Sequence, residues 1–239
     1  MFFMLSFAYR RLFVKLFMEN DMGEKKPAWI LKDRIFSEDH MFTRLLGYAI
    51  EENLTETYQA LYYARDKHSG QSRHTSHFSD EHIPYIIHPL MMACHAHAMG
   101  IKDDKVLATI LLHDVCEDCG VKPEKLPFSE PVKHSVFLLT KPDDYTGTPE
   151  NRKKYFDGIA SDETASIVKA LDRCNNIGLM ALAFSNEKMI DYIEETQEYL
   201  CPILEKMKHD SPAYNDAVFL IKYQLRSTIE TIKAFIMKT

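Results

Sequence analysis

The chain has 239 residues, of which 46% are hydrophobic and 27% are charged, and its formal net charge is −6. That composition is typical of a globular protein with a sizeable core, and the negative charge argues against a protein that coats nucleic acid. No run of about 18 uncharged apolar residues occurs, so the sequence predicts no membrane span. Its five cysteines show no disulfide-framework spacing, which is typical of a reducing compartment and predicts a cytoplasmic protein.

Residues 1–35 are predicted to be an N-terminal extension of the folded domain. The first eighteen residues mix apolar side chains with Arg10, Arg11 and Lys15. A secretory signal places its basic residues before the apolar stretch rather than within it. We therefore interpret the segment as an upstream extension with a later natural start, and an amphipathic surface helix is the alternative.

Residues 36–239 are predicted to form one all-α domain. Apolar residues recur at helical steps through 104–118 and again through 218–235. Long alternating runs bounded by turn dipeptides, which indicate strands, are missing from the sequence. The expected architecture is therefore a helical bundle.

The segment HDVCED, residues 113–118, places ionisable side chains within what the periodicity predicts to be one apolar helix. His113 and Asp114 are costly in such a setting unless they are paired or bind a metal. Glu117 follows His113 by about one turn, and Asp118 follows Asp114 by the same step. A solvated helix end is the alternative, and this segment alone does not decide between the two.

Two further segments favour a metal site. His88 comes directly before Pro89, which is a residue favoured in the first turn of a helix. Asp172 lies among apolar residues in the segment KALDRCNNI, where a carboxylate needs a partner. Imidazole and carboxylate ligands together suit a divalent metal and leave positions for water and phosphate oxygen. The predicted ligands of one buried metal ion are His88, His113, Asp114 and Asp172.

The order of these motifs resembles the hydrolase domain of the RelA/SpoT family, and most of all its stand-alone small alarmone hydrolases of the metazoan SpoT type. The shared pattern is HP, then HDxxED, then KxxDRxxN. The segments DKHSGQSR, PYIIHP and ETQEYLCPI are similar to further family motifs, in the family's order. The match extends over roughly residues 50–205, and several motifs in the right order are far more specific than any one of them.

The resemblance implies an HD-type helical bundle that hydrolyses the 3′-diphosphate of guanosine 3′,5′-bis(diphosphate), ppGpp, usually with Mn²⁺, and releases pyrophosphate. It implies that the four predicted ligands bind the metal and that Glu117 and Asp118 position or activate water. It also implies a set of nucleotide contacts, in which a purine stacks on Arg73, the ribose lies near Asn176, and phosphates meet Lys188, Tyr192 and the cationic region around Lys153.

The chain departs from the family at two places beside the expected purine pocket. Ten residues separate Arg73 from Pro84, which is more than the family has, and Leu179 stands where the family often has threonine. Choosing a base requires hydrogen bonds to its edge, so we expect weaker base selectivity than in the family.

Several alternatives stay open from the sequence. One is an HD-type phosphohydrolase of another nucleotide, such as a nucleoside monophosphate, a dNTP or NADPH. Another is a non-catalytic nucleotide sensor. The oligomeric state is open. Cys116 and Cys119 form a CxxC that we interpret as two small packing residues, with redox control as the alternative.

Overall fold

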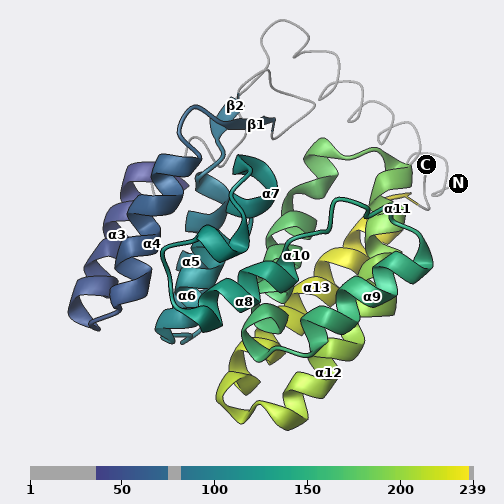
Figure 1. Ribbon diagram of the computed structural model, residues 1–239. Helices are drawn as coiled ribbons and strands as arrows, with labels where there is room; N and C mark the ends of the chain where they lie inside the picture. The colour runs from purple at the N-terminus through teal and green to yellow at the C-terminus, as the bar shows by residue number, and fades with distance from the viewer. Residues whose placement is uncertain (1–35, 75–81, 237–239) are drawn as a thin grey trace, which may run out of the picture.

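The computed structural model describes residues 36–74 and 82–236, and within them the chain is built almost entirely of helices (Figure 1). The predicted extension 1–35 and the middle of the lengthened loop, 75–81, lie outside the described residues. The elements of the first half are α3 (Glu38–Glu51), α4 (Thr55–Lys67), β1 (Ser72–His74), β2 (His82–Pro84), α5 (Ile87–Ala98), α6 (Asp104–Leu112), α7 (Val115–Cys119), the 3-10 turn η2 (Pro123–Lys125) and α8 (Glu130–Leu139). The elements of the second half are α9 (Pro149–Ala160), α10 (Glu163–Ala183), α11 (Asn186–Glu195), the π-helical turn η3 (Thr196–Leu200), α12 (Cys201–Asp210), the 3-10 turn η4 (Pro212–Tyr214) and α13 (Asn215–Ile236).

The predicted all-helical bundle is confirmed, with one small addition. β1 and β2 form an antiparallel hairpin in which Arg73 lies opposite Ile83. The hairpin brings the chain from the end of α4 to the start of α5. Each strand has only three residues, which is too short to produce a recognisable alternating pattern in the sequence.

The prediction of one continuous helix over 104–118 is wrong. The chain leaves the helix after Leu112, turns at His113 and Asp114, and starts the short helix α7 at Val115. Gly120, with φ of +65°, ends α7 in the left-handed conformation that glycine adopts without strain. The break is invisible to periodicity because buried apolar side chains continue on both sides of it, from Val106 to Cys116.

The centre of the molecule is formed by α5, α6 and α10. Every residue of α6 from Val106 to Leu112 is buried, as expected of a helix that is apolar on all sides. The long helix α10 contacts α5 and α6 on one side and α9, α12 and α13 on the other, so it joins the two halves of the bundle (Figure 1). Residues of the predicted metal site therefore come from the centre of the fold, in or next to these three helices.

Aspartates fix the starts of the helices that position the site. Asp103 caps α6 by accepting from the backbone N–H groups of Lys105 and Val106, and Asp162 caps α10 by accepting from Ala165. Asp104 caps a different helix: its carboxylate accepts from two N–H groups in the first turn of α4, at 2.9 and 2.7 Å. This contact fixes α4 against α6, and with it the entry to the hairpin.

One buried arginine joins α10 to α11 and η3. Arg173 is 1% exposed, and its Nη1 donates to the carbonyl of Tyr192 and to the hydroxyl of Thr196, both at 3.0 Å. Its Nη2 pairs with the Glu195 carboxylate, and its guanidinium lies 3.7 Å from the centre of the Tyr192 ring. Such a guanidinium satisfies several partners at once, so it orients α11 relative to the central helix.

We expect Arg173→Met to lower the free energy of unfolding by about 3 kcal/mol or more, because it leaves the partly buried Glu195 without its main partner. Urea denaturation followed by circular dichroism measures the change. The matched control is Arg44→Met, which removes an exposed guanidinium that lies over Tyr48 at 5.5 Å and should cost less than about 1 kcal/mol. Equal losses in the two variants would contradict the role given to Arg173.

Candidate metal centre

The polar side chains at the centre of the bundle converge from three places in the fold. His88 lies in the first turn of α5, His113 and Asp114 lie at the break between α6 and α7, and Asp172 lies in the middle of α10. One ligand atom each from His88, His113 and Asp114 lie within 4.8 Å of one another. The Asp172 Oδ1 atom is 3.3 Å from Nε2 of His88 and 4.0 Å from Nε2 of His113. Residues separated by up to 84 positions thus meet at one point.

The break between α6 and α7 explains how two adjacent residues can both face this point. Successive side chains of a regular helix point in directions about 100° apart. At the break, His113 keeps a helical ψ of −34°, whereas Asp114 has φ of −98° and ψ of −7°, so the backbone departs from regular helix geometry at Asp114, directly before α7. The Asp114 Oδ2 atom is consequently 2.9 Å from the His113 Nε2 atom.

Both imidazoles are held by their other nitrogen. Nδ1 of His113 lies 2.8 Å from the Ile110 carbonyl oxygen, and Nδ1 of His88 lies 2.8 Å from Oδ1 of Asn175. An oxygen acceptor at Nδ1 places the proton there and leaves Nε2 as the free ligand nitrogen, which is the usual arrangement of histidines that bind metal. The buried Nε2 of His113 lies 2.9 Å from Oδ2 of Asp114, but the two atoms are not aligned for a hydrogen bond, so the nitrogen faces the cluster as a ligand would.

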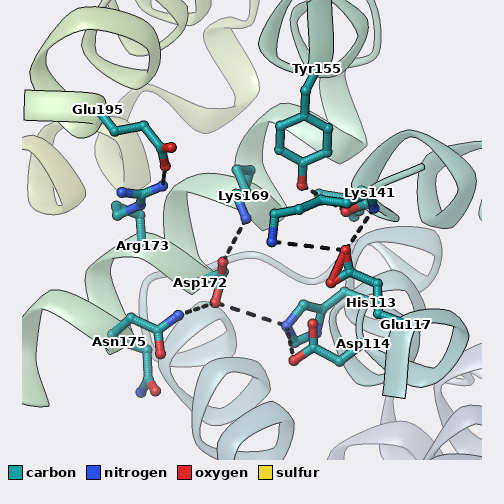
Figure 2. Close-up of polar contacts among 12 residues, drawn as sticks. His113, Asp114, Glu117, Lys141, Tyr155, Lys169, Asp172, Arg173, Asn175 and Glu195 are labelled. Carbon is teal, nitrogen blue, oxygen red and sulfur yellow. Dashed lines mark hydrogen bonds and ion pairs between the residues drawn. The ribbon is translucent and has the colours of Figure 1, made fainter. Parts of the chain in front are cut away.

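The carboxylates are also held by specific donors, which sequence reasoning missed. The Tyr85 hydroxyl donates to Oδ2 of Asp114 at 2.6 Å. The Lys169 ammonium donates to Oδ2 of Asp172 at 3.0 Å, and Nδ2 of Asn176 donates to Oδ1 of the same residue at 2.6 Å. Figure 2 shows Asp172 between Lys169 on one side and the His113–Asp114 pair on the other. Tyr85 and Lys169 lie within the quoted motifs, but only the fold shows which carboxylate each one contacts.

Burial and mutual attraction set the charges of the cluster. Burial lowers the pKa of His113, but Asp114 and Asp172 outweigh this effect and raise the pKa to about 9. Burial raises the pKa of Asp114, but His113 and His88 hold it below its usual range. Burial likewise opposes ionisation of Asp172, whose pKa is held well below its usual range by Lys169 and His88. Two ionised carboxylates therefore share a buried space that attracts positive charge.

The residues fit a divalent cation. Two oriented imidazole nitrogens and two carboxylates offer a mixed nitrogen and oxygen ligand set suited to Mn²⁺ or a similar metal. In the absence of an ion, a proton on His113 supplies part of the positive charge that the carboxylates require. A bound cation would replace that proton, since only the neutral imidazole is a ligand.

The structure places the two predicted catalytic acids beside this cluster rather than in it. Oε1 of Glu117 accepts from the backbone N–H of Lys141 at 2.7 Å, and the Lys141 ammonium is 3.9 Å away (Figure 2). The backbone carbonyl of Asp118 accepts from the Gln71 amide at 3.1 Å. Lys141, the residue that Glu117 contacts, lines a cavity of about 760 Å³ together with Thr140, Lys154 and Tyr155.

The residues predicted to contact the nucleotide lie on several elements around the cluster of His88, His113, Asp114 and Asp172. Asn176 adjoins Asp172 directly, and Arg73 lies on β1 of the hairpin. Lys188 and Tyr192 both contact Phe184: the ammonium lies 3.9 Å from the centre of its ring, and the Tyr192 ring packs against it in a T-shaped arrangement. Lys153 is well exposed on α9 and pairs with Asp157 at 2.6 Å.

The structure also shows the surroundings of Leu179 and of the CxxC pair Cys116 and Cys119. Leu179 lines a cavity of about 390 Å³ between α3, α5 and α10, together with Asn175, Arg44 and Met91. The Cys116 and Cys119 thiols are free, and burial raises the pKa of Cys116 to about 11. A thiol with a raised pKa is unreactive near neutral pH, which favours the packing interpretation of this pair.

Curated proteins that resemble the chain in sequence include several that carry the same name. No protein-family model matches the chain. A guanosine-3′,5′-bis(diphosphate) 3′-pyrophosphohydrolase of Aquifex aeolicus is 27% identical over 193 residues, covering 79% of this chain and 27% of that protein. The enzyme of the same name from Vibrio cholerae is 30% identical over 168 residues, covering 67% of this chain and 23% of that protein. The chain thus spans about a quarter of the length of these curated relatives.

A solved structure of a metazoan ortholog of SpoT, a protein described as hydrolysing ppGpp, aligns with a TM-score of 0.55 at 20% identity. The alignment covers 74% of this chain and 93% of the other. The helical fold and its buried cluster of histidine and aspartate define an HD-type domain. The relatives in sequence and fold confirm its relationship to the hydrolase domain of the RelA/SpoT family. Among the helices of the described residues, none is long and apolar enough to span a membrane.

We expect Asn175→Ala to weaken binding of Mn²⁺ about 10- to 100-fold, because the His88 ring loses the acceptor that fixes its orientation and tautomer. Isothermal titration calorimetry of the purified chain measures the affinity. Asn186→Ala, at an exposed position on α11, is the matched control and should bind the ion as the unchanged chain does. Unaltered affinity in Asn175→Ala would show that His88 needs no such support.

Replacing Asp172 should remove the ion without unfolding the protein if the substitution preserves the contact with Lys169. In Asp172→Asn the amide oxygen can still accept from the Lys169 ammonium, while the charge that attracts the metal is lost. We expect metal content after dialysis to fall to a small fraction of the unchanged chain, with helicity retained. Full metal occupancy in this variant would exclude Asp172 from the ligand set.

Proposed function

We propose that the chain is a metal-dependent phosphohydrolase that cleaves the 3′-diphosphate of guanosine 3′,5′-bis(diphosphate) and releases pyrophosphate. The observation that supports this most directly is the meeting of His88, His113, Asp114 and Asp172 at one buried point, with both histidine Nε2 atoms directed inward. The enzymes of Aquifex aeolicus and Vibrio cholerae that resemble the chain are named for this reaction.

The four residues would hold the ion, and the surrounding residues would perform the remaining steps. A divalent ion such as Mn²⁺ supplies Lewis acidity for activating water and polarising a phosphoryl oxygen. Glu117 would accept the proton of the attacking water, since its carboxylate lies just beyond the break that carries His113 and Asp114. Its contact with the backbone of Lys141 holds the carboxylate in one orientation.

Cations around the site suit a diphosphate leaving group. Lys141 and Lys154 line the cavity beside Glu117, and Lys188 lies one turn from Tyr192 on α11. Positive groups placed where negative charge develops stabilise the transition state of phosphoryl transfer. Lys153 remains a prediction as a phosphate contact, and its ion pair with Asp157 would have to open for it to take part.

The nucleoside half of the substrate would lie between the hairpin and α10. Asn176 would approach the ribose, and Arg73 on β1 would stack on the purine. A guanidinium stacks on any purine, so it contributes affinity without selecting guanine. Leu179 presents no hydrogen-bonding group where a base edge would be recognised, so we expect weaker selection for guanine than in the family.

A nucleotide panel tests the proposed reaction. The purified chain with Mn²⁺ is given ppGpp, its adenosine analogue, GTP, dNTPs, NADPH and nucleoside monophosphates, and the products are separated by anion-exchange chromatography. We expect pyrophosphate from ppGpp, with the adenosine analogue cleaved within about tenfold of its rate, because Leu179 does not discriminate between the bases. Preferred cleavage of NADPH, dNTPs or monophosphates would favour a different HD phosphohydrolase, and binding without cleavage would favour a nucleotide sensor.

The role given to Glu117 has a separate test. Glu117→Gln preserves the shape of the side chain but removes the base, so we expect kcat on ppGpp to fall about 10²-fold or more with the metal retained. The matched control is Glu51→Gln, at an exposed acid that ends α3, which should leave kcat unchanged. Unchanged turnover in Glu117→Gln would assign the proton transfer to another group, with Asp118 as the next candidate.

A further inference from the structure

The last helix exposes an apolar face that the proposed hydrolase site does not use. On α13, Phe219 is 69% exposed, Tyr223 is 67% exposed and Leu220 is 44% exposed. Phe219 and Tyr223 are four residues apart, so their rings lie on the same side of the helix. Large side chains clustered in this way on a protein surface mark an interaction site more often than isolated ones do.

A groove runs beside this face, between α12 and α13. It has a volume of about 790 Å³ and is lined by apolar side chains that include Cys201, Leu204, Val218, Phe219 and Tyr223. Charged residues edge the groove. None of the residues assigned above to the metal centre or to nucleotide contacts lines it, so an occupant of the groove would leave the metal centre accessible.

The exposed residues of α13 follow the spacing of a coiled-coil seam. Steps of three and four residues alternate along the helix, which keeps one narrow stripe facing a neighbouring helix. We call this stripe the α13 seam, and it consists of Asp216, Phe219, Tyr223, Arg226, Glu230 and Lys233. Its positions are exposed except Lys233, which is half-buried and also donates to Gln197.

The charges of one α13 seam are complementary to those of a second copy of the seam that runs antiparallel to it. With a two-fold axis between residues 224 and 225, Asp216 of one copy meets Lys233 of the other, and Tyr223 meets Arg226. Both contacts occur twice by symmetry, as an ion pair and as a guanidinium against an aromatic ring. Parallel pairing would instead oppose each charge to itself, so the charges select the antiparallel arrangement.

We propose that two copies of this chain form a dimer by antiparallel pairing of their α13 seams, each α13 lying along the α12–α13 groove of the other copy. Phe219 of each copy then faces Glu230 of the other and covers the apolar wall of its groove. A helix of 22 residues is about 33 Å long. A contact between two such helices and their grooves lies near the lower end of the sizes of stable interfaces, so we expect a reversible dimer in equilibrium with the monomer.

Sedimentation equilibrium of the full chain with charge-swapped variants tests the proposal. The unchanged chain should show a monomer–dimer equilibrium. Asp216→Lys and Lys233→Asp each turn two attractions into two repulsions, so each should weaken association about tenfold, an effect of about 1.4 kcal/mol. The double variant with both changes regenerates the complementary pairs in reverse and should restore association.

The matched control combines Asp216→Lys with Lys125→Asp, which gives the same net charge as the restoring double variant but changes a lysine outside the seam. This control should remain weakened. Thermal unfolding of every variant confirms that the chain is folded, since the substituted positions contribute little to the core. A chain that is monomeric at all concentrations would overturn the proposal, as would a dimer that neither single change weakens. Failure of the double variant to restore association would overturn the antiparallel register.

Discussion

The fold is organised around two ionised carboxylates in a helical core. Asp114 and Asp172 lie close to the same two imidazoles, where burial opposes the charge of both acids. An isolated buried carboxylate costs several kcal/mol, so each one requires donors and positive charge close by. Those donors come from the hairpin end, from α5 and from α10, so these elements must pack in a way that brings all of the donors to the same point.

Much of the architecture could be predicted from the sequence because its causes are local. The helical content follows from the spacing of apolar residues, and polar side chains in apolar stretches singled out the residues of the candidate metal centre. His88 and Asp172 stood out because each is a polar group in a segment that otherwise predicts a core. The meeting of these residues needed more than periodicity, and the order of the motifs supplied it.

What the sequence did not show depends on contacts between distant residues. The turn at His113–Asp114 interrupts a stretch in which buried apolar residues resume directly at Val115, so the periodicity did not reveal it. Asn175 supports His88 across 87 positions, and its neighbour Asn176 contacts Asp172 instead. Two adjacent asparagines with different tasks are indistinguishable until the direction of each side chain around α10 is known.

The ion pair between Lys169 and Asp172 has a consequence for how such a site can change over evolutionary time. The ammonium is buried, and the carboxylate of Asp172 is what balances it. A substitution that removes the carboxylate leaves a buried positive charge, whereas one that removes the lysine leaves an acid with less support. A chain that loses this carboxylate in the course of evolution would have to lose the lysine with it or pass through an amide at position 172. The two positions should therefore vary as a pair, even though only one of them is proposed to bind the ion.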